Sequence, residues 1–160
     1  GLLAQPFRFF ENIWRRLIVA QQGTLMVAEH QGDIIAGVIF LRWKDTLIYK
    51  FSASDQNALN LRGTDLLIWE GIRHGQAQGC HQLDFGLSDL DQDGLIRYKR
   101  KFSSEEKTIS FLSTSARHVP TSAQQQAREL LPGLTRLFTD ESVPDHLTSE
   151  AGDLLYQFFA

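Results

Sequence analysis

The sequence has a single cysteine, Cys80, among its 160 residues, so no disulfide can form within the chain. Proteins without disulfides suit a reducing compartment, and the sequence therefore predicts a cytoplasmic location. The chain also lacks an apolar run of the ~18 residues that a membrane-spanning helix needs. Its longest such run, residues 34–41, has the length of a strand, so no membrane span is predicted.

A strong excess of charge of either sign is missing as well. The 19 acidic and 16 basic residues give a formal net charge of -3. This balance argues against a protein that binds nucleic acid over its whole surface, so no DNA partner is expected, although a local basic patch is compatible with it. A hydrophobic content of 42% and a length of 160 residues are typical of one globular domain.

What the chain does have is a succession of strand and helix patterns that predicts an α/β fold. The connections between the first three strands are too short for a crossover, so these strands should form an antiparallel meander. A helix then precedes the fourth strand, which predicts a parallel crossover. The expected strands are residues 25–29, 34–42, 46–52, 82–85 and 108–112, and the expected helices are residues 6–22, 64–79, 95–102, 123–138 and 150–159.

Residues 83–102 carry the densest set of functional side chains, and metal sites are the first interpretation to test. Asp84-Phe85-Gly86 matches the metal-binding turn of protein kinases, but the chain has no Gly-rich phosphate loop and is too short for a kinase. Residues 89–94 match the start of an EF-hand calcium loop, yet Arg100 stands where that loop needs a bidentate Glu. No His or Cys spacing typical of zinc occurs either. The sequence therefore predicts no metal site.

The remaining candidate in this stretch is its basic end, Arg97-Tyr98-Lys99-Arg100-Lys101. Four cations within five residues can meet phosphates, a carboxylate, or an oxyanion that forms during acyl transfer. The same run is also typical of a solvated helix face that nearby acidic residues partly neutralise. Both interpretations stay open, with Arg97, Arg100 and Lys101 as candidate substrate-binding or tRNA-binding residues.

A series of short motifs extends this picture to about residues 5–113. In order, they are Val27-Ala28-Glu29, Ile34-Ile35-Ala36-Gly37, Tyr49, Ser52-Ala53-Ser54-Asp55, Leu66-Leu67-Ile68-Trp69-Glu70, Leu83-Asp84-Phe85-Gly86 and Gly94-Leu95-Ile96-Arg97-Tyr98-Lys99. In this order and spacing they resemble the Fem-type (FemABX-like) branch of the GNAT acyltransferase superfamily. The resemblance implies a GNAT-like α/β fold, in which helices flank a mixed, mainly antiparallel sheet.

The same resemblance implies an acyl- or aminoacyltransferase that acts on an amine acceptor, with cell-envelope, peptidoglycan or polysaccharide metabolism as the expected setting. The Phe-Lys pair of that family falls on Tyr98-Lys99. Lys99 is then expected to stabilise the negative charge of a tetrahedral intermediate, and Tyr98 to shape the pocket. Asp84 is expected to orient the site by its family position.

The start of the long helix, residues 60–65, bears on the donor. GNAT enzymes hold the coenzyme A pyrophosphate there with Q/R-x-x-G-x-G/A, where backbone N–H groups bind anions. Here Asn60 replaces Gln or Arg, and Asp65 places a like charge where the phosphate would sit. Of the two donors that the resemblance implies, aminoacyl-tRNA therefore gains weight over acyl-CoA. Arg62 and Gly63 are candidate anion-binding residues, although an ordinary loop explains them equally well.

The resemblance also bears on domain organisation. Because the family commonly carries two GNAT-like units and this chain begins with Gly1, we expect an upstream GNAT-like domain. Residues 1–113 should form the transferase domain, and residues 114–160 a helical extension packed on it. Two functions remain: a transferase, or a non-catalytic binding or scaffolding half of a larger protein.

Overall fold

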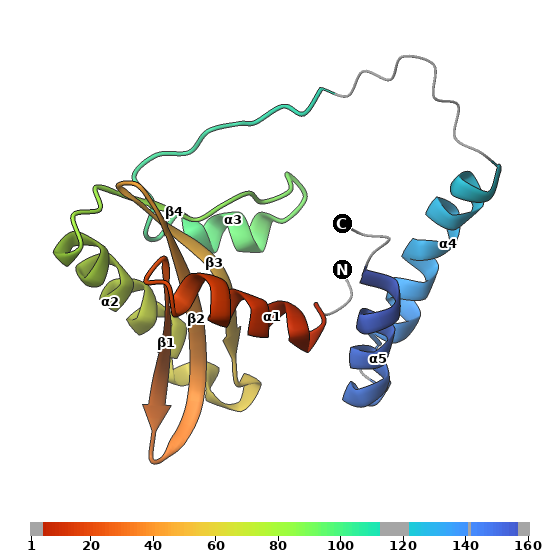
Figure 1. Cartoon of the computed structure of the whole chain (residues 1–160), viewed down its shortest axis with the longest axis horizontal. Coiled ribbons are helices and arrows are strands. Elements are labelled where there is room, and N and C mark those ends of the chain that lie inside the picture. Colours follow the sequence, from red (N-terminus) through yellow and green to blue (C-terminus); the bar gives the residue numbers. More distant parts are fainter. Residues whose placement is uncertain (1–4, 113–121, 141, 157–160) are drawn as a thin grey trace. The chain divides into compact units, whose positions relative to one another are not determined.

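A computed structural model of the chain describes residues 5–112, 122–140 and 142–156 (Figure 1). The chain divides into two compact units. Trp14–Lys107 forms the first, and the described parts of Gly1–Ile13 and Thr108–Ala160 form the second. Every candidate site residue named above belongs to the first unit.

The first unit is built on a four-stranded sheet with the order β1-β2-β3-β4 (Figure 1). Antiparallel pairing joins the first three strands, and β4 runs parallel to β3. This confirms the predicted α/β fold with a mixed, mainly antiparallel sheet. The strands are β1 (Gly23–His30), β2 (Asp33–Trp43), β3 (Thr46–Ser54) and β4 (Gln82–Asp84).

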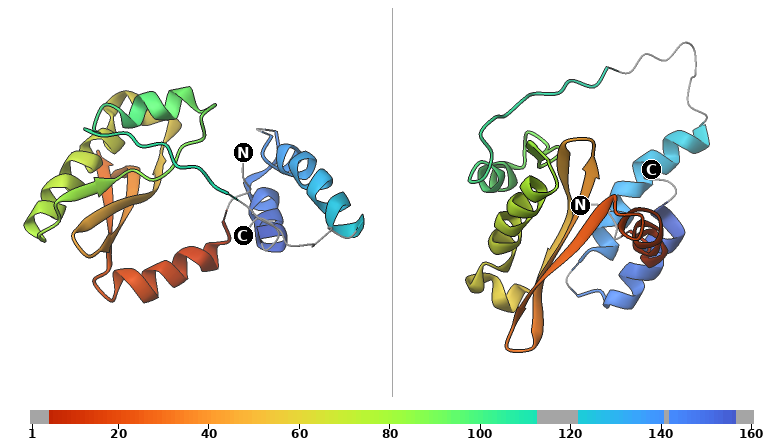
Figure 2. Two further views of the ribbon diagram at one scale, coloured as in Figure 1. Left: turned by 90° about the horizontal axis from the view of Figure 1, so that it is seen from above. Right: turned by 60° about the vertical axis from the view of Figure 1, so that its left-hand side comes forward.

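The helix α2 (Gly63–Ala77) covers one face of this sheet and makes the crossover from β3 to β4 (Figure 2). Its buried residues include Leu67, Ile68, Gly71 and Gly75, which recur three and four residues apart as on one face of an amphipathic helix. Gly71 lies on the same face, where an added Cβ would collide with the ring of Phe40. The absence of a side chain at Gly71 therefore lets the helix lie close to the core of the sheet.

The pairing of β3 with β4 is short, and this shapes the site. Only Thr46, Leu47 and Ile48 pair with β4, whereas β3 continues to Ser54. Among the described strands, none pairs with residues 52–54 on that side. An unpaired strand edge presents backbone N–H and C=O groups that are available to another molecule.

Two further short helices follow the ends of these strands. The 3-10 helix η2 (Gln56–Leu61) leads from β3 into α2, where only a loop was predicted. Asp55 caps η2, because its Oδ1 accepts a hydrogen bond of 2.9 Å from the backbone N–H of Asn57. After β4 in the chain comes α3 (Asp93–Lys99), which contains the start of the basic run and has no buried residue.

Several expected boundaries are wrong. The first predicted helix divides into α1 (Phe7–Ile13) and the π-helix η1 (Trp14–Ile18), and α2 begins at Gly63, one residue before its predicted cap. Residues 108–112 form no strand, although their polar and apolar side chains alternate. Alternation describes the two faces of a strand, but a strand also needs a partner, and no described strand pairs with this segment.

The second unit contains α4 (Ser122–Phe138) and α5 (Asp145–Leu155). A hydrogen bond of 2.8 Å from Thr148 Oγ1 to the carbonyl oxygen of Phe138 joins them. α5 begins five residues earlier than predicted, directly after Pro144, whose fixed φ suits a helix start. None of the helices in the described residues combines the length and the apolar character that crossing a membrane requires.

Candidate functional site

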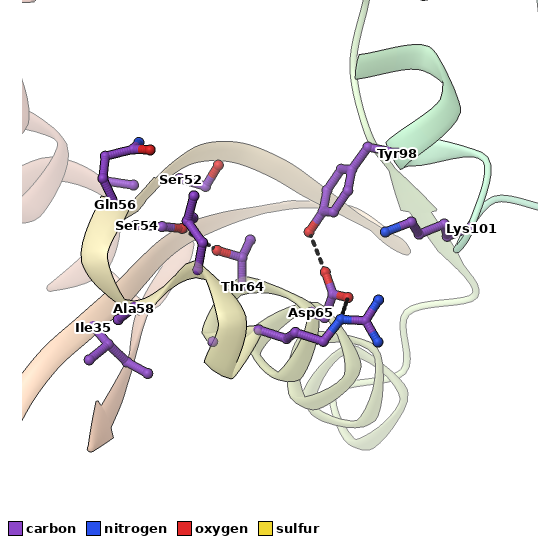
Figure 3. Close-up of a pocket in the computed structure, with 13 residues that line it drawn as sticks. Ile35, Ser52, Ser54, Gln56, Ala58, Thr64, Asp65, Tyr98 and Lys101 are labelled. Carbon is purple, nitrogen blue, oxygen red and sulfur yellow. Dashed lines mark hydrogen bonds and ion pairs between the residues drawn. The ribbon is translucent and has the colours of Figure 1, made fainter. Parts of the chain in front are cut away.

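A pocket of about 620 Å³ lies in the first unit, where the end of β3, η2, the start of α2 and the α3 region meet (Figure 3). It adjoins the stretch of β3 that has no partner strand among the described residues. The lining residues are Ile35, Ser52, Ala53, Ser54, Gln56, Ala58, Leu59, Arg62, Gly63, Thr64, Asp65, Tyr98 and Lys101.

The first turn of α2 forms one wall of this pocket because the chain turns sharply before it. Arg62 adopts the left-handed conformation, with φ of 56°, and so ends η2 and begins α2 in a single residue. A Cβ on Gly63 would lie 3.0 Å from Cβ of Ala36, so a larger residue would push the helix off β2. Hydroxyls follow, since Thr64 Oγ1 and Ser54 Oγ share a hydrogen bond of 2.6 Å.

Asp65 connects the two walls of the pocket. Its Oδ1 accepts a hydrogen bond of 2.9 Å from the hydroxyl of Tyr98, and its Oδ2 lies 3.5 Å from Nε of Arg62 (Figure 3). Burial raises the pKa of Tyr98 above its usual value, and the neighbouring carboxylate of Asp65 raises it further. Tyr98 therefore stays protonated at neutral pH and remains a hydrogen-bond donor.

The charges of the pocket are mixed. Arg62 and Lys101 bring positive charge, and Nζ of Lys101 lies 4.9 Å from the centre of the Tyr98 ring. Among the described residues that line the pocket, Asp65 is the one acidic side chain. An anion that enters would therefore meet two cations, several hydroxyls and one like charge.

Lys99 and Asp84 lie outside this lining, and both bind backbone groups of the turn that follows β4. Nζ of Lys99 donates hydrogen bonds of 2.7 Å to the carbonyl oxygen of Leu87 and 3.3 Å to that of Gly86. Asp84 Oδ1 accepts a hydrogen bond of 2.7 Å from the N–H of Gly86. Burial lowers the pKa of Lys99, and the negative charge of Asp84 partly opposes this shift. The turn is thus held from both ends by ionisable side chains.

A series of aromatic contacts links the pocket to the core. The Phe40 ring in the core meets Tyr49 at 5.9 Å between ring centres, and Tyr49 meets Phe85 at 5.6 Å. Phe102 stacks on Phe85 at 6.1 Å and contacts Tyr98 at 5.7 Å. These rings hold Tyr98 against the sheet, although α3 buries no residue of its own.

The predicted site residues thus fall into three groups. Arg62, Gly63, Tyr98 and Lys101 line the pocket. Lys99 and Asp84 hold the neighbouring turn, while Arg97 is exposed and Arg100 forms hydrogen bonds of 2.7 and 3.0 Å with the exposed carboxylate of Glu106. Sequence reasoning did not assign the polar pocket residues Ser52, Ser54, Gln56 and Thr64 to the site, although Ser52 and Ser54 belong to a motif of the resemblance.

Metal chemistry finds no support in this part of the molecule. Within residues 5–112, 122–140 and 142–156, no group of three or more His, Cys, Asp or Glu side chains is arranged to hold a metal ion. The aspartates of the segment that resembles a calcium loop do not form such a group. Asp89 instead begins a turn in which its N–H donates to Oε1 of Gln92 at 3.1 Å.

Comparison with known proteins gives a family and a fold. A family model described as an acetyltransferase (GNAT) domain matches residues 2–100. No curated protein matches the sequence. One similar solved structure is AAC(6')-Iy in complex with the bisubstrate analog CoA-S-monomethyl-acetylneamine, with a TM-score of 0.57 and 12% identity over 69% of this chain and 82% of that chain.

Two other solved structures show the same fold. The apo aminoglycoside antibiotic 6'-N-acetyltransferase AAC(6')-IG from Acinetobacter haemolyticus has a TM-score of 0.54 and 10% identity, over 70% of this chain and 84% of that chain. A transcriptional regulator from Bacillus halodurans C-125 has a TM-score of 0.51 and 14% identity, over 68% and 77% of the two chains. At such identities these likenesses concern the fold alone.

Proposed function

The chain belongs to the family of acetyltransferase (GNAT) domains, and we propose that it transfers an acyl group from acyl-coenzyme A to a primary amine. The observation that carries this proposal is the pocket of about 620 Å³ between the first turn of α2, the unpaired part of β3 and the α3 region. A fold neighbour, AAC(6')-Iy, was solved with a bisubstrate analog that contains CoA, which supports the choice of donor.

The pocket fits the chemistry of such a donor in two ways. The first N–H groups of α2 have no partner within the helix and favour an anion, and Arg62 and Lys101 add positive charge beside them. The end of β3 at residues 52–54, with which no described strand pairs on the side of β4, offers backbone groups to the amides of an extended pantetheine arm. The residues therefore suit a ligand with a phosphate end and an amide-bearing arm.

The proposed reaction is balanced without any further reagent. The amine nitrogen attacks the thioester carbonyl, a C–N bond forms and the C–S bond breaks. The amine loses one proton, and the departing thiolate takes one up. Tyr98, a protonated hydroxyl at the pocket wall, shapes the space in which this happens.

For Lys99 and Asp84 we propose positioning roles. Lys99 binds the carbonyl oxygens of Gly86 and Leu87, and Asp84 binds the N–H of Gly86, so together they fix the turn that precedes α3. Two of the three N–H donors of the Lys99 ammonium bind these carbonyls, which leaves one for the electrostatic role that the resemblance gives to Lys99. Positioning agrees better with the contacts it makes.

A Fem-type activity is the second candidate. In it an aminoacyl-tRNA would be the donor, a cell-envelope precursor such as a peptidoglycan amine the acceptor, and the exposed Arg97 a contact to the tRNA. The observation in its favour is Asp65, whose carboxylate opposes a pyrophosphate in the pocket. Binding of tRNA should then weaken steeply with salt, because cations on the protein replace ions around the nucleic acid.

The predictions on chain organisation stay proposals. They are a domain over residues 1–113, a helical extension over 114–160 packed on it, an upstream GNAT-like domain, and a cytoplasmic location. A non-catalytic scaffolding half also stays an alternative. It predicts that ligands bind without turnover.

One experiment separates these functions. The purified chain receives acetyl-coenzyme A with a panel of primary amines that includes an aminoglycoside, and thiol release is measured. We expect release that depends on the amine. A parallel reaction supplies a labelled aminoacyl-tRNA, and transfer there without thiol release would favour the Fem-type activity. Absence of turnover with both donors would favour the scaffolding half.

A further inference from the structure

The pocket contains a negatively charged side chain of its own, the carboxylate of Asp65. This carboxylate engages hydrogen-bond donors to which a phosphate would otherwise bind. Asp65 is the third residue of α2, within the turn whose free N–H groups favour negative charge. Its side chain is 26% exposed, whereas that of Arg62 is 70% exposed. The carboxylate is therefore the more sheltered member of the ion pair and stays in the wall of the pocket.

Both partners of Asp65 are donors that an incoming phosphate would otherwise engage. The Tyr98 hydroxyl donates to Oδ1, and the Arg62 guanidinium lies beside Oδ2. A phosphate has to compete with the carboxylate for these donors and also meets its like charge. The described lining has two cations. Arg62 lies beside the Asp65 carboxylate, whereas the ammonium of Lys101 lies over the Tyr98 ring.

Building on the proposed function, we propose that Asp65 determines donor specificity by weakening the binding of the phosphate end of coenzyme A. The pantetheine arm would then supply most of the binding energy through the hydroxyls and the backbone of residues 52–54. The donor thioester is then held mainly through its pantetheine arm, and its phosphates contribute little at the start of α2. The neutral residue Asn at this position would convert the pocket into a stronger coenzyme A site.

The test uses Asp65→Asn, because the amide keeps an oxygen that accepts from Tyr98, removes the negative charge and replaces the second carboxylate oxygen with an NH2 group. The chain offers a matched control in Glu70→Gln on the same helix. Glu70 also pairs with an arginine three residues away, Arg73 at 3.0 Å, and it does not line the pocket. Thermal unfolding checks that both variants fold as the wild type does.

Isothermal titration then measures the affinity of each protein for coenzyme A and for phosphate-free pantetheine at low and high salt. We expect Asp65→Asn to bind coenzyme A about tenfold more tightly than wild type, a gain that falls as salt rises. Pantetheine affinity should change by less than about twofold, since this ligand lacks the phosphates. Glu70→Gln should match the wild type with both ligands.

The remaining outcomes overturn the proposal. Unchanged or weaker coenzyme A binding by Asp65→Asn would show that the carboxylate does not oppose the phosphates. An equal gain in the affinity for pantetheine would show that the effect does not act through the phosphates. If neither ligand bound to the wild type or to the variant, the proposed function itself would fail, whereas the first two outcomes leave it intact.

Discussion

The pocket beside α2 and the turn after β4 both receive a side chain from the end of α3, and they use it differently. In the pocket, Tyr98 reaches a charged partner from a distant element, since Asp65 lies 33 residues earlier in the chain. In the turn, Lys99 binds backbone carbonyls only 12 and 13 residues away. Neighbouring residues thus serve two regions, because successive side chains of a helix point about 100° apart.

This difference separates two kinds of dependence. The pocket joins α2 to α3 through ionisable groups, so changes of charge should alter what it binds. The turn is held by hydrogen bonds to its own backbone, so changes at Lys99 should alter its shape. Substitutions that keep charge or keep shape can therefore distinguish the two regions.

The largest expected effect is in the turn, from Lys99→Ala. This substitution removes a partly buried ammonium together with its two hydrogen bonds to the turn. We therefore expect a loss of roughly 1.5 kcal/mol in the free energy of unfolding and a transfer rate at least about tenfold lower. Denaturant unfolding and thiol release measure the two effects. Lys107→Ala, at an exposed lysine paired with Glu105, is the control and should leave both unchanged.

The outcome for Lys99→Arg then decides between positioning and electrostatics. Arginine keeps the charge but cannot reproduce the two contacts of a compact ammonium. A positioning role predicts that Lys99→Arg also loses activity. A transfer rate of Lys99→Ala within twofold of the wild type would remove both roles.

The next largest effect concerns coenzyme A binding in the pocket. It is tested by comparing Arg62, the N-cap of α2, with Arg73 within that helix. Arg62→Ala should weaken coenzyme A binding about fivefold, because it removes one of the two cations of the pocket lining. Stability should change little, since Arg62 is largely exposed and its ion pair is long. Arg73→Ala removes an arginine outside the pocket that also pairs with a carboxylate three residues away, and the coenzyme A affinity of this variant should equal that of the wild type.

A smaller effect is expected from Tyr98→Phe. The ring and its contacts remain, but the hydrogen bond to Asp65 is lost, so the free energy of unfolding should fall by about 1 kcal/mol at neutral pH. The pKa of Tyr98 is raised in the folded protein, and its contribution is therefore complete below the unfolded value of ~10. Above pH ~10 it is lost progressively.

Unfolding experiments at several pH values measure this dependence. The stability gap between wild type and Tyr98→Phe should narrow as the pH rises above ~10. Burial also raises the pKa of Tyr49, but this residue is present in both proteins, and its effect cancels in the comparison. A gap that stays constant to high pH would show that the hydroxyl of Tyr98 makes no contribution linked to its protonation.

The sequence predicts the sheet better than its surroundings, for a physical reason. Alternating side chains and short turns define β1 to β3, and the helix before β4 fixes its parallel direction. The strand expected at residues 108–112 is wrong, because alternation cannot reveal whether a partner strand is present. The π-helix η1 likewise follows a pattern that a regular helix would share.

For the site, the sequence predicts which segment matters but not which side chains meet. The basic run at residues 97–101 is visible in the sequence itself. Two of its residues, Tyr98 and Lys101, are three positions apart and both line the pocket. That Lys99 turns instead to Gly86 and Leu87 depends on the phase of a short helix. The hydroxyls of Ser54 and Thr64 meet only because α2 crosses back over the sheet.

The central claim is that the pocket at the start of α2 receives the acyl donor. Backbone amide shifts of the isotope-labelled chain, recorded by NMR during a titration with coenzyme A, test it most directly. If the pocket receives the donor, the largest changes should occur at Ser52 to Ser54 and at Arg62 to Asp65, with smaller ones at Tyr98. Saturable binding that leaves these amides unshifted would contradict it.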